Sequence, residues 1–157
     1  MRKITIAEFG TEYGLSAAGT WLDIERVASA ELSSEDPQHP FEGALRTDTA
    51  KGWKASVPGA QLIRLRFDHP QSVKRIHLEF REEQVDRSQE IALFATSIGS
   101  SRRELVRQQW VFNSRGATTE VEDYFFDLKD VTTLEIEIDP GRHDKHVFAS
   151  LQSIQIG

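Results

Sequence analysis

In QLIRLRF (Gln61–Phe67), apolar and charged side chains alternate, so that every second residue falls on the same side of an extended chain. The same alternation returns in VKRIHLEF (Val73–Phe80) and VTTLEIEID (Val131–Asp139). A strand points successive side chains to opposite faces, and antiparallel sheets commonly bury one face only. The three stretches therefore predict half-buried strands of an antiparallel sheet.

Five further stretches between turn signals read as strands: Leu22–Ala28, Glu90–Ala95, Leu105–Phe112, Val121–Leu128 and Val147–Ile156. No long apolar pattern of helical period interrupts them, and the best helical candidate, Gly19–Val27, is short. About eight strands at roughly ten-residue spacing predict an all-β antiparallel sandwich of the jelly-roll type. We expect one domain over residues 1–157, with residues 1–27 as an N-terminal extension of uncertain structure.

The charge and composition of the chain disfavour several classes of partner and location. The chain of 157 residues has a net charge of −6 and no cysteine. The acidic balance disfavours nucleic acid as a partner, because phosphate neutralisation needs a basic excess. No run approaches the ~20 apolar residues of a membrane span, and the start MRKITIAEFG lacks the apolar core of a secretory signal. We therefore expect no membrane association and a cytoplasmic location.

Three segments resemble the discoidin, or coagulation-factor C-type, family of galactose-binding-like domains. The first is ASAELSSEDPQHPFEGALRTDTAKGW (Ala28–Trp53), the second VPGAQLIRLRFDHPQSVKRIHLEF (Val57–Phe80) and the third FASLQSIQI (Phe148–Ile156). The resemblance implies a jelly roll with Trp53 in the core. It also implies a carbohydrate-binding or other surface-recognition module, usually without catalysis.

The resemblance also locates a calcium site that this sequence departs from. The positions that hold calcium in many relatives are Arg46, Lys51 and Ser153 here. Calcium needs six to eight oxygen ligands, several of them carboxylate, so we expect no metal and no other cofactor. Either Arg46 or Lys51 fills the former site, paired with Asp48, or both cations point into solvent.

If the strands run up and down in order, alternate loops meet at one end of the sandwich. That end collects the loops 31–53, 81–88, 113–119 and 141–146, and loops on rigid scaffolds commonly carry function. An exposed ring stacks on a sugar face while arginine and histidine donate to hydroxyl groups. The predicted ligand-binding residues are His39, Phe41, Arg87, Arg115, Arg142 and His143.

Alternation along Arg102–Phe112 places Gln108 beside Trp110 on one strand face. A buried glutamine needs hydrogen-bond partners, which Arg87, Glu90 or Glu104 would supply across the sheet. This cluster reads either as a network that fixes strand register or as a polar strip facing a ligand.

No nucleophile elbow, phosphate loop or HExxH pattern occurs, and the short run GRHDKH (Gly141–His146) is weak support for a metal. The leading hypothesis is thus a non-catalytic binding module for a carbohydrate-type ligand. The alternative is a cytoplasmic protein-interaction or structural domain, in an oligomeric state that the sequence leaves open, with no sugar ligand.

Overall fold

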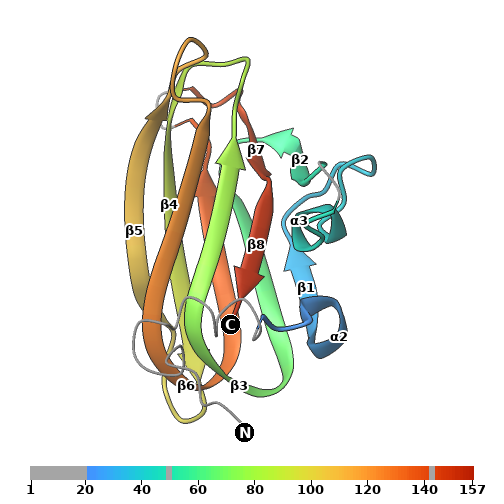
Figure 1. Ribbon diagram of the computed structural model, residues 1–157, viewed down its shortest axis with the longest axis vertical. Helices are drawn as coiled ribbons and strands as arrows, with labels where there is room; N and C mark the ends of the chain where they lie inside the picture. The colour runs from blue at the N-terminus through green and yellow to red at the C-terminus, as the bar shows by residue number, and fades with distance from the viewer. Residues whose placement is uncertain (1–20, 49–50, 142–143) are drawn as a thin grey trace, which may run out of the picture.

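The computed structural model describes residues 21–48, 51–141 and 144–157. It confirms the predicted antiparallel β-sandwich, whose two layers are seen in Figure 1. Two long strands dominate it, β3 (Gln61–Arg81) and β6 (Thr119–Asp139), and they pair with each other along most of their lengths. The pairing is antiparallel, as the alternation predicts.

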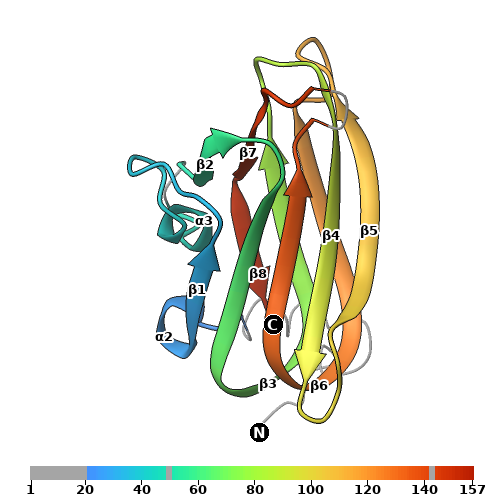
Figure 2. The same ribbon diagram turned by 180° about the vertical axis from the view of Figure 1, so that it is seen from behind.

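The β3–β6 ribbon bends back on itself in the middle. Its register is regular up to the pair Arg66↔Thr133, shifts through the bend, and becomes regular again from Arg75↔Phe125. Asp130 in the bend has a positive φ of 54°. Figures 1 and 2 show the turn at the bottom of the molecule, from which each strand runs back up in the opposite layer. Each of the two strands therefore contributes to both layers.

One layer has the order β1 (Ala28–Leu32), β3, β6, β4 (Arg87–Ser97), β5 (Arg103–Phe112). It uses the first arm of β3 and the second arm of β6. The second layer contains β8 (Ser153–Ile156), the second arm of β3 and the first arm of β6. A small separate sheet pairs β2 (Trp53–Pro58) with β7 (Phe148–Leu151).

Several boundaries differ from the sequence prediction. The predicted strands Gln61–Phe67 and Val73–Phe80 are one continuous strand, β3, and Val121–Leu128 and Val131–Asp139 are likewise one strand, β6. Ile24–Val27 forms a short helix, α2, inside the helical candidate Gly19–Val27, although Leu22–Ala28 was also read as a strand, and β1 begins only at Ala28. A second short helix, α3 (Glu42–Leu45), was not expected. The predicted strand Val147–Ile156 is divided at Gln152 into β7 and β8, because its two halves pair with different partners, β2 and β3.

The core lies between the layers and contains the inward residues that alternation selects. Ile63, Leu65, Ile76 and Leu78 are at most 1% exposed, and Trp53 is fully buried, as predicted. Burying a side chain of this size stabilises the fold by about 1.5–3 kcal/mol relative to leaving it exposed. No helix of the described part of the chain is long and apolar enough to span a membrane.

Ion pairs cover the outer face of the β1–β3–β6–β4–β5 layer. Arg64 bonds both Glu31 on β1 and Glu135 on β6, at 2.9 Å each, and Arg102 bonds Glu135 at 2.8 Å. Burial acts to raise the pKa of Glu135, but hydrogen bonds from Arg102 and Arg64 hold that pKa below its usual value. The cross-strand pairs thus fix the register of the sheet on its solvent side.

Candidate ligand-binding site

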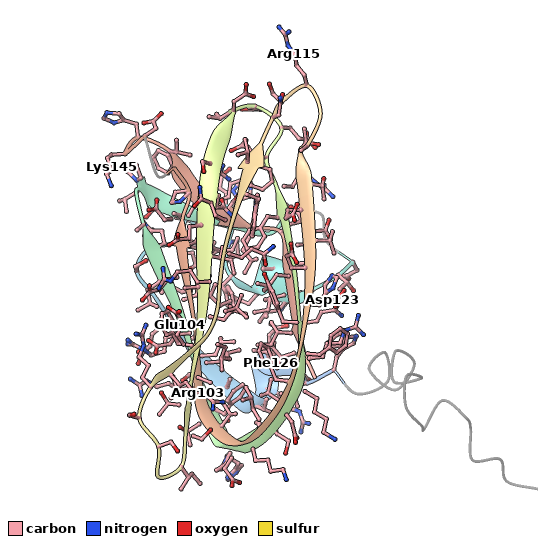
Figure 3. All side chains as sticks on the ribbon, turned by 90° about the vertical axis from the view of Figure 1, so that its left-hand side faces the viewer. Arg103, Glu104, Arg115, Asp123, Phe126 and Lys145 are labelled. Carbon is pink, nitrogen blue, oxygen red and sulfur yellow. The ribbon has the colours of Figure 1, made fainter. Side chains whose placement is uncertain are left out.

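The structure separates the residues that were expected to form one loop cluster. Arg115 is exposed at the tip of the loop after β5, at one extreme of the molecule in Figure 3. His39 lies on the flank instead, in the segment between β1 and α3, seen at the side of the sandwich in Figure 1. Arg142 and His143 lie outside the described residues. The single-end ligand cluster is therefore not shown for His39 and Arg115, and it stays a prediction.

His39 occupies a structured corner of the flank. Its ring Nδ1 lies 3.1 Å from Oδ2 of Asp36, and its backbone oxygen accepts a hydrogen bond from Lys54 on β2. The backbone amide of Gln38, and then the His39 ring, hold the pKa of Asp36 below its usual value. The Asp36 contact therefore orients the His39 ring, whose side chain remains partly exposed.

A hollow of about 570 Å³ opens beside His39 and α3. Its lining is Pro37, Gln38, His39, Pro40, Glu42, Gly43, Arg46 and Lys51. His39 lines this hollow, and its backbone oxygen also accepts from Lys54 of β2, so it stands between the hollow and the small β2–β7 sheet.

Phe41 does not provide the exposed ring that was predicted. It is 3% exposed and belongs to the hydrophobic core, just before α3. Its backbone amide donates to Oε2 of Glu35 at 2.7 Å, which fixes the turn into the helix. The polar loop sequence around Phe41 suggested exposure, but its ring is part of the hydrophobic core.

Arg87 is buried rather than presented to solvent, with a side chain 2% exposed. Its Nη1 donates to the carbonyl oxygen of Phe148 at 2.9 Å, and its Nε lies 3.3 Å from Oε1 of Glu82. The guanidinium also lies over the ring of Phe112 at 5.4 Å. Burial lowers the pKa of Arg87, and Glu82 partly offsets that effect. Arg87 therefore supports β7 from within.

The small sheet above Arg87 presents a mixed aromatic and polar surface. We call it the β2–β7 face and define it as Lys54, Ser56, Phe148 and Ser150. Phe148 is 50% exposed, whereas its neighbour Ala149 is fully buried. Lys54 and Ser150 are register partners, so their side chains share one side of the sheet.

Sequence reasoning missed Phe148, although the signal was present. FASL alternates, and the buried partners Ala149 and Leu151 leave Phe148 facing outward. The family resemblance identified Phe148–Ile156 only as the closing strand and did not say which of its side chains face outward. An aromatic residue in the exposed register of a short strand is the feature that identifies it.

The three positions that the family resemblance assigned to calcium have other contacts in this structure. Arg46 forms a two-point ion pair with Glu25 near α2, with contacts of 2.7 and 3.1 Å, so its main partner is Glu25 rather than the expected Asp48. Lys51 is exposed and lines the hollow beside α3. Ser153 pairs in register with Glu79 on β3. Among the described residues no group of three or more histidine and acidic side chains is placed to hold a metal.

No protein-family model matches the chain, and no curated protein is similar to it in sequence. Among solved structures, it is similar to the family 32 carbohydrate-binding module of Clostridium perfringens NanJ in complex with galactose. The TM-score is 0.59 and the identity 16%, over 82% of this chain and 92% of that one.

Two further structures are similar to the chain. One is the fifth family 32 module of the Clostridium perfringens protein CpGH89, in complex with GalNAc-β-1,3-galactose; its TM-score is 0.63 and its identity 14%, over 87% of this chain and 99% of the module. The other is a chain of reduced XRCC1 bound to the catalytic domain of DNA polymerase β, with a TM-score of 0.60 and 14% identity, over 84% and 95% of the two chains. The protein therefore has the β-sandwich fold of the family 32 carbohydrate-binding modules, the galactose-binding-like fold.

Proposed function

We propose that the protein is a non-catalytic carbohydrate-binding module and that the β2–β7 face is its ligand-binding surface. The observation that carries the proposal is the exposed ring of Phe148 on a short, paired strand beside polar side chains. An aromatic ring offers an apolar surface to the C–H face of a sugar. Because Phe148 lies on a paired strand, its backbone is already ordered and little entropy is lost on binding.

The polar groups around Phe148 suit hydroxyl groups. Lys54 is a donor, Ser150 donates and accepts, and the His39 ring is oriented by Asp36 at the edge of the face. A site of a few polar groups beside one aromatic anchor is the usual composition of a saccharide-sized site. Arg87 would act as a positioning residue, because it contacts the backbone of Phe148 from below.

The similar structures support the saccharide class. Two of the three were solved with a galactose-containing ligand. The protein-interaction alternative has less support, because charged pairs such as Arg64–Glu135 cover the broad outer face that a partner would need.

The decisive test uses the two most exposed phenylalanines of the described chain, Phe148 and Phe125, which are 50% and 67% exposed. A glycan array identifies the best saccharide, and calorimetry then measures its Kd. Phe148→Ala should raise the Kd about tenfold, the loss expected for one stacking ring of about 1.5 kcal/mol. Phe125→Ala, on the outer side of β6, should leave the Kd unchanged.

A Phe148→Ala protein that folds and binds as tightly as the original would overturn the site. The absence of any glycan signal, together with a defined oligomer by light scattering, would overturn the carbohydrate function itself.

A further inference from the structure

Two edge strands from different layers lie next to each other on the open side of the sandwich. β5 pairs through its backbone with β4, and the first arm of β6 pairs with β3. Figure 3 faces this side, with Glu104 marking β5 and Asp123 marking β6. The side is therefore closed by side chains rather than by a backbone ladder.

A chain of polar side chains crosses this opening. The Tyr124 hydroxyl donates to Oε1 of Gln108, and Nε2 of Gln108 donates to Oε1 of Glu122 at 2.8 Å. Glu120, two residues earlier on the same face of β6, shares a hydrogen bond with Glu122. Glu122 thus interacts with Gln108 on one side and with Glu120 on the other, and the raised pKa of Glu120 assigns the shared proton to Glu120.

The partners that the sequence suggested for Gln108 are engaged elsewhere. Arg87 pairs with Glu82, while Glu90 and Glu104 both pair with Arg107 on the outer side of the sheet. Gln108 instead joins β5 to the opposite layer. The network interpretation of this strand is supported, but with partners across the sandwich rather than within the sheet.

Behind the chain lie buried polar groups that lack partners. Gln89 on β4 is fully buried, and neither atom of its amide has a hydrogen-bond partner among the described residues. Its register partner is Trp110, whose buried Nε1 also has none. The Trp110 ring packs on Phe80 at 5.1 Å, and Phe80 is the register partner of Glu120. The unpaired groups and Glu120 therefore occupy the same level of the interior.

The charges around Glu120 are few. Its own strand contributes Glu122 and Tyr124, β3 contributes the apolar Phe80 and Leu78, and β5 contributes the neutral Gln108 and Trp110. From β4 comes Arg87, which is paired with Glu82. Burial first, and then Glu122, raise the pKa of Glu120 to about 7. No described cation offsets the repulsion between the two acids once both are ionised.

We propose that this cluster is a proton-linked hydration site. With Glu120 protonated, the chain Tyr124–Gln108–Glu122–Glu120 holds the open side closed. When Glu120 releases its proton to solvent, the two carboxylates repel, the side opens, and water enters to pair with Gln89 and Trp110. The opening lets water form hydrogen bonds with the Gln89 amide and the Trp110 indole N–H. This is favourable because a buried polar group without a hydrogen bond is costly.

The test follows the side-chain N–H resonances of Trp110 and Gln89 by NMR between pH 5 and 8.5. In the wild-type protein both should shift with a midpoint near 7. Glu120→Gln, which cannot ionise, should keep both resonances at their low-pH positions throughout. Asp127→Asn, an exposed acid on the same arm, is the matched control and should titrate like the wild-type protein.

A second variant keeps the proposal testable if Glu120→Gln does not fold. Glu122→Gln removes the repelling charge, so ionisation of Glu120 should no longer open the side, and both resonances should stay near their low-pH positions. Hydrogen exchange of β5 amides, corrected for the intrinsic pH effect, should rise across the same interval in the wild-type protein only. The proposal fails if the Glu120 carboxyl titrates near 4.5 in the wild-type protein, or if neither resonance responds to pH.

Discussion

Nη1 of Arg87 donates a hydrogen bond to the carbonyl oxygen of Phe148 at 2.9 Å. This bond joins β4 of the main sandwich to β7 of the small sheet, two elements that share no backbone pairing. Arg87 holds the backbone of Phe148, and the exposed ring of Phe148 belongs to the proposed ligand-binding surface. A buried side chain therefore helps to set the position of that ring.

Arg87→Met should destabilise the protein by about 3 kcal/mol. The substitution leaves the Glu82 carboxylate and the Phe148 carbonyl without their buried partner, and breaking such a pair is costly. Urea denaturation measures the loss. Arg115→Met, at an exposed loop tip, should change the free energy of unfolding by no more than about 0.5 kcal/mol. Equal stabilities for the two variants would contradict the supporting role of Arg87.

Gly52→Ala should be more destabilising than Gly99→Ala. Both glycines have positive φ, 64° and 75°, so each alanine carries the backbone strain of that region. At Gly52 an added Cβ also comes within 2.8 Å of the Leu151 carbonyl oxygen, whereas at Gly99 nothing lies within 4 Å. Thermal unfolding of the two variants separates backbone strain, about 1 kcal/mol, from the clash. A Gly52→Ala protein as stable as Gly99→Ala would show that the loop before β2 yields easily.

Glu135→Gln should make the free energy of unfolding depend less on pH in the acidic range. The folded protein holds the pKa of Glu135 below 4.5, so this residue contributes stability that is present above pH 4.5 and is lost as the pH falls through its folded pKa. The wild-type protein should therefore lose stability below pH 4.5 more steeply than the variant. Urea unfolding from pH 3 to 7 measures both slopes. Glu137 accepts a hydrogen bond from Arg102, whereas Glu135 accepts from both Arg64 and Arg102, so Glu137→Gln should show a smaller effect. Parallel slopes would mean that Arg64 and Arg102 do not stabilise the ionised form.

The acid pair on β6 acts in the opposite direction. Glu120 has a raised pKa, so its contribution is complete below 4.5 and is lost as the pH rises toward 7. The effects of the two residues on stability fall in different pH ranges. The Glu135 effect is measured below pH 4.5, and the Glu120 effect between pH 4.5 and 7.

The sequence by itself predicted which residues face inward. Period-two alternation predicted strands at Gln61–Phe67, Val73–Phe80 and Val131–Asp139, and together with the family resemblance it led to the jelly roll and to a buried Trp53. These features depend on neighbours in the chain, because a strand's two faces are set by its own sequence.

Other features depend on contacts between residues far apart in the chain. Phe41 is buried because its ring joins the core formed by residues distant in the chain, and Arg46 meets Glu25 because α2 lies near α3. Gln108 reaches Glu122 across the sandwich only because the β3–β6 ribbon bends and brings the first arm of β6 beside β5. Alternation assigns a side chain to a face, but the register and the bend decide which side chain it meets there. For this protein the sequence thus determined the faces of the sandwich, and the tertiary structure alone decided which side chains meet at the β2–β7 face and around Glu120.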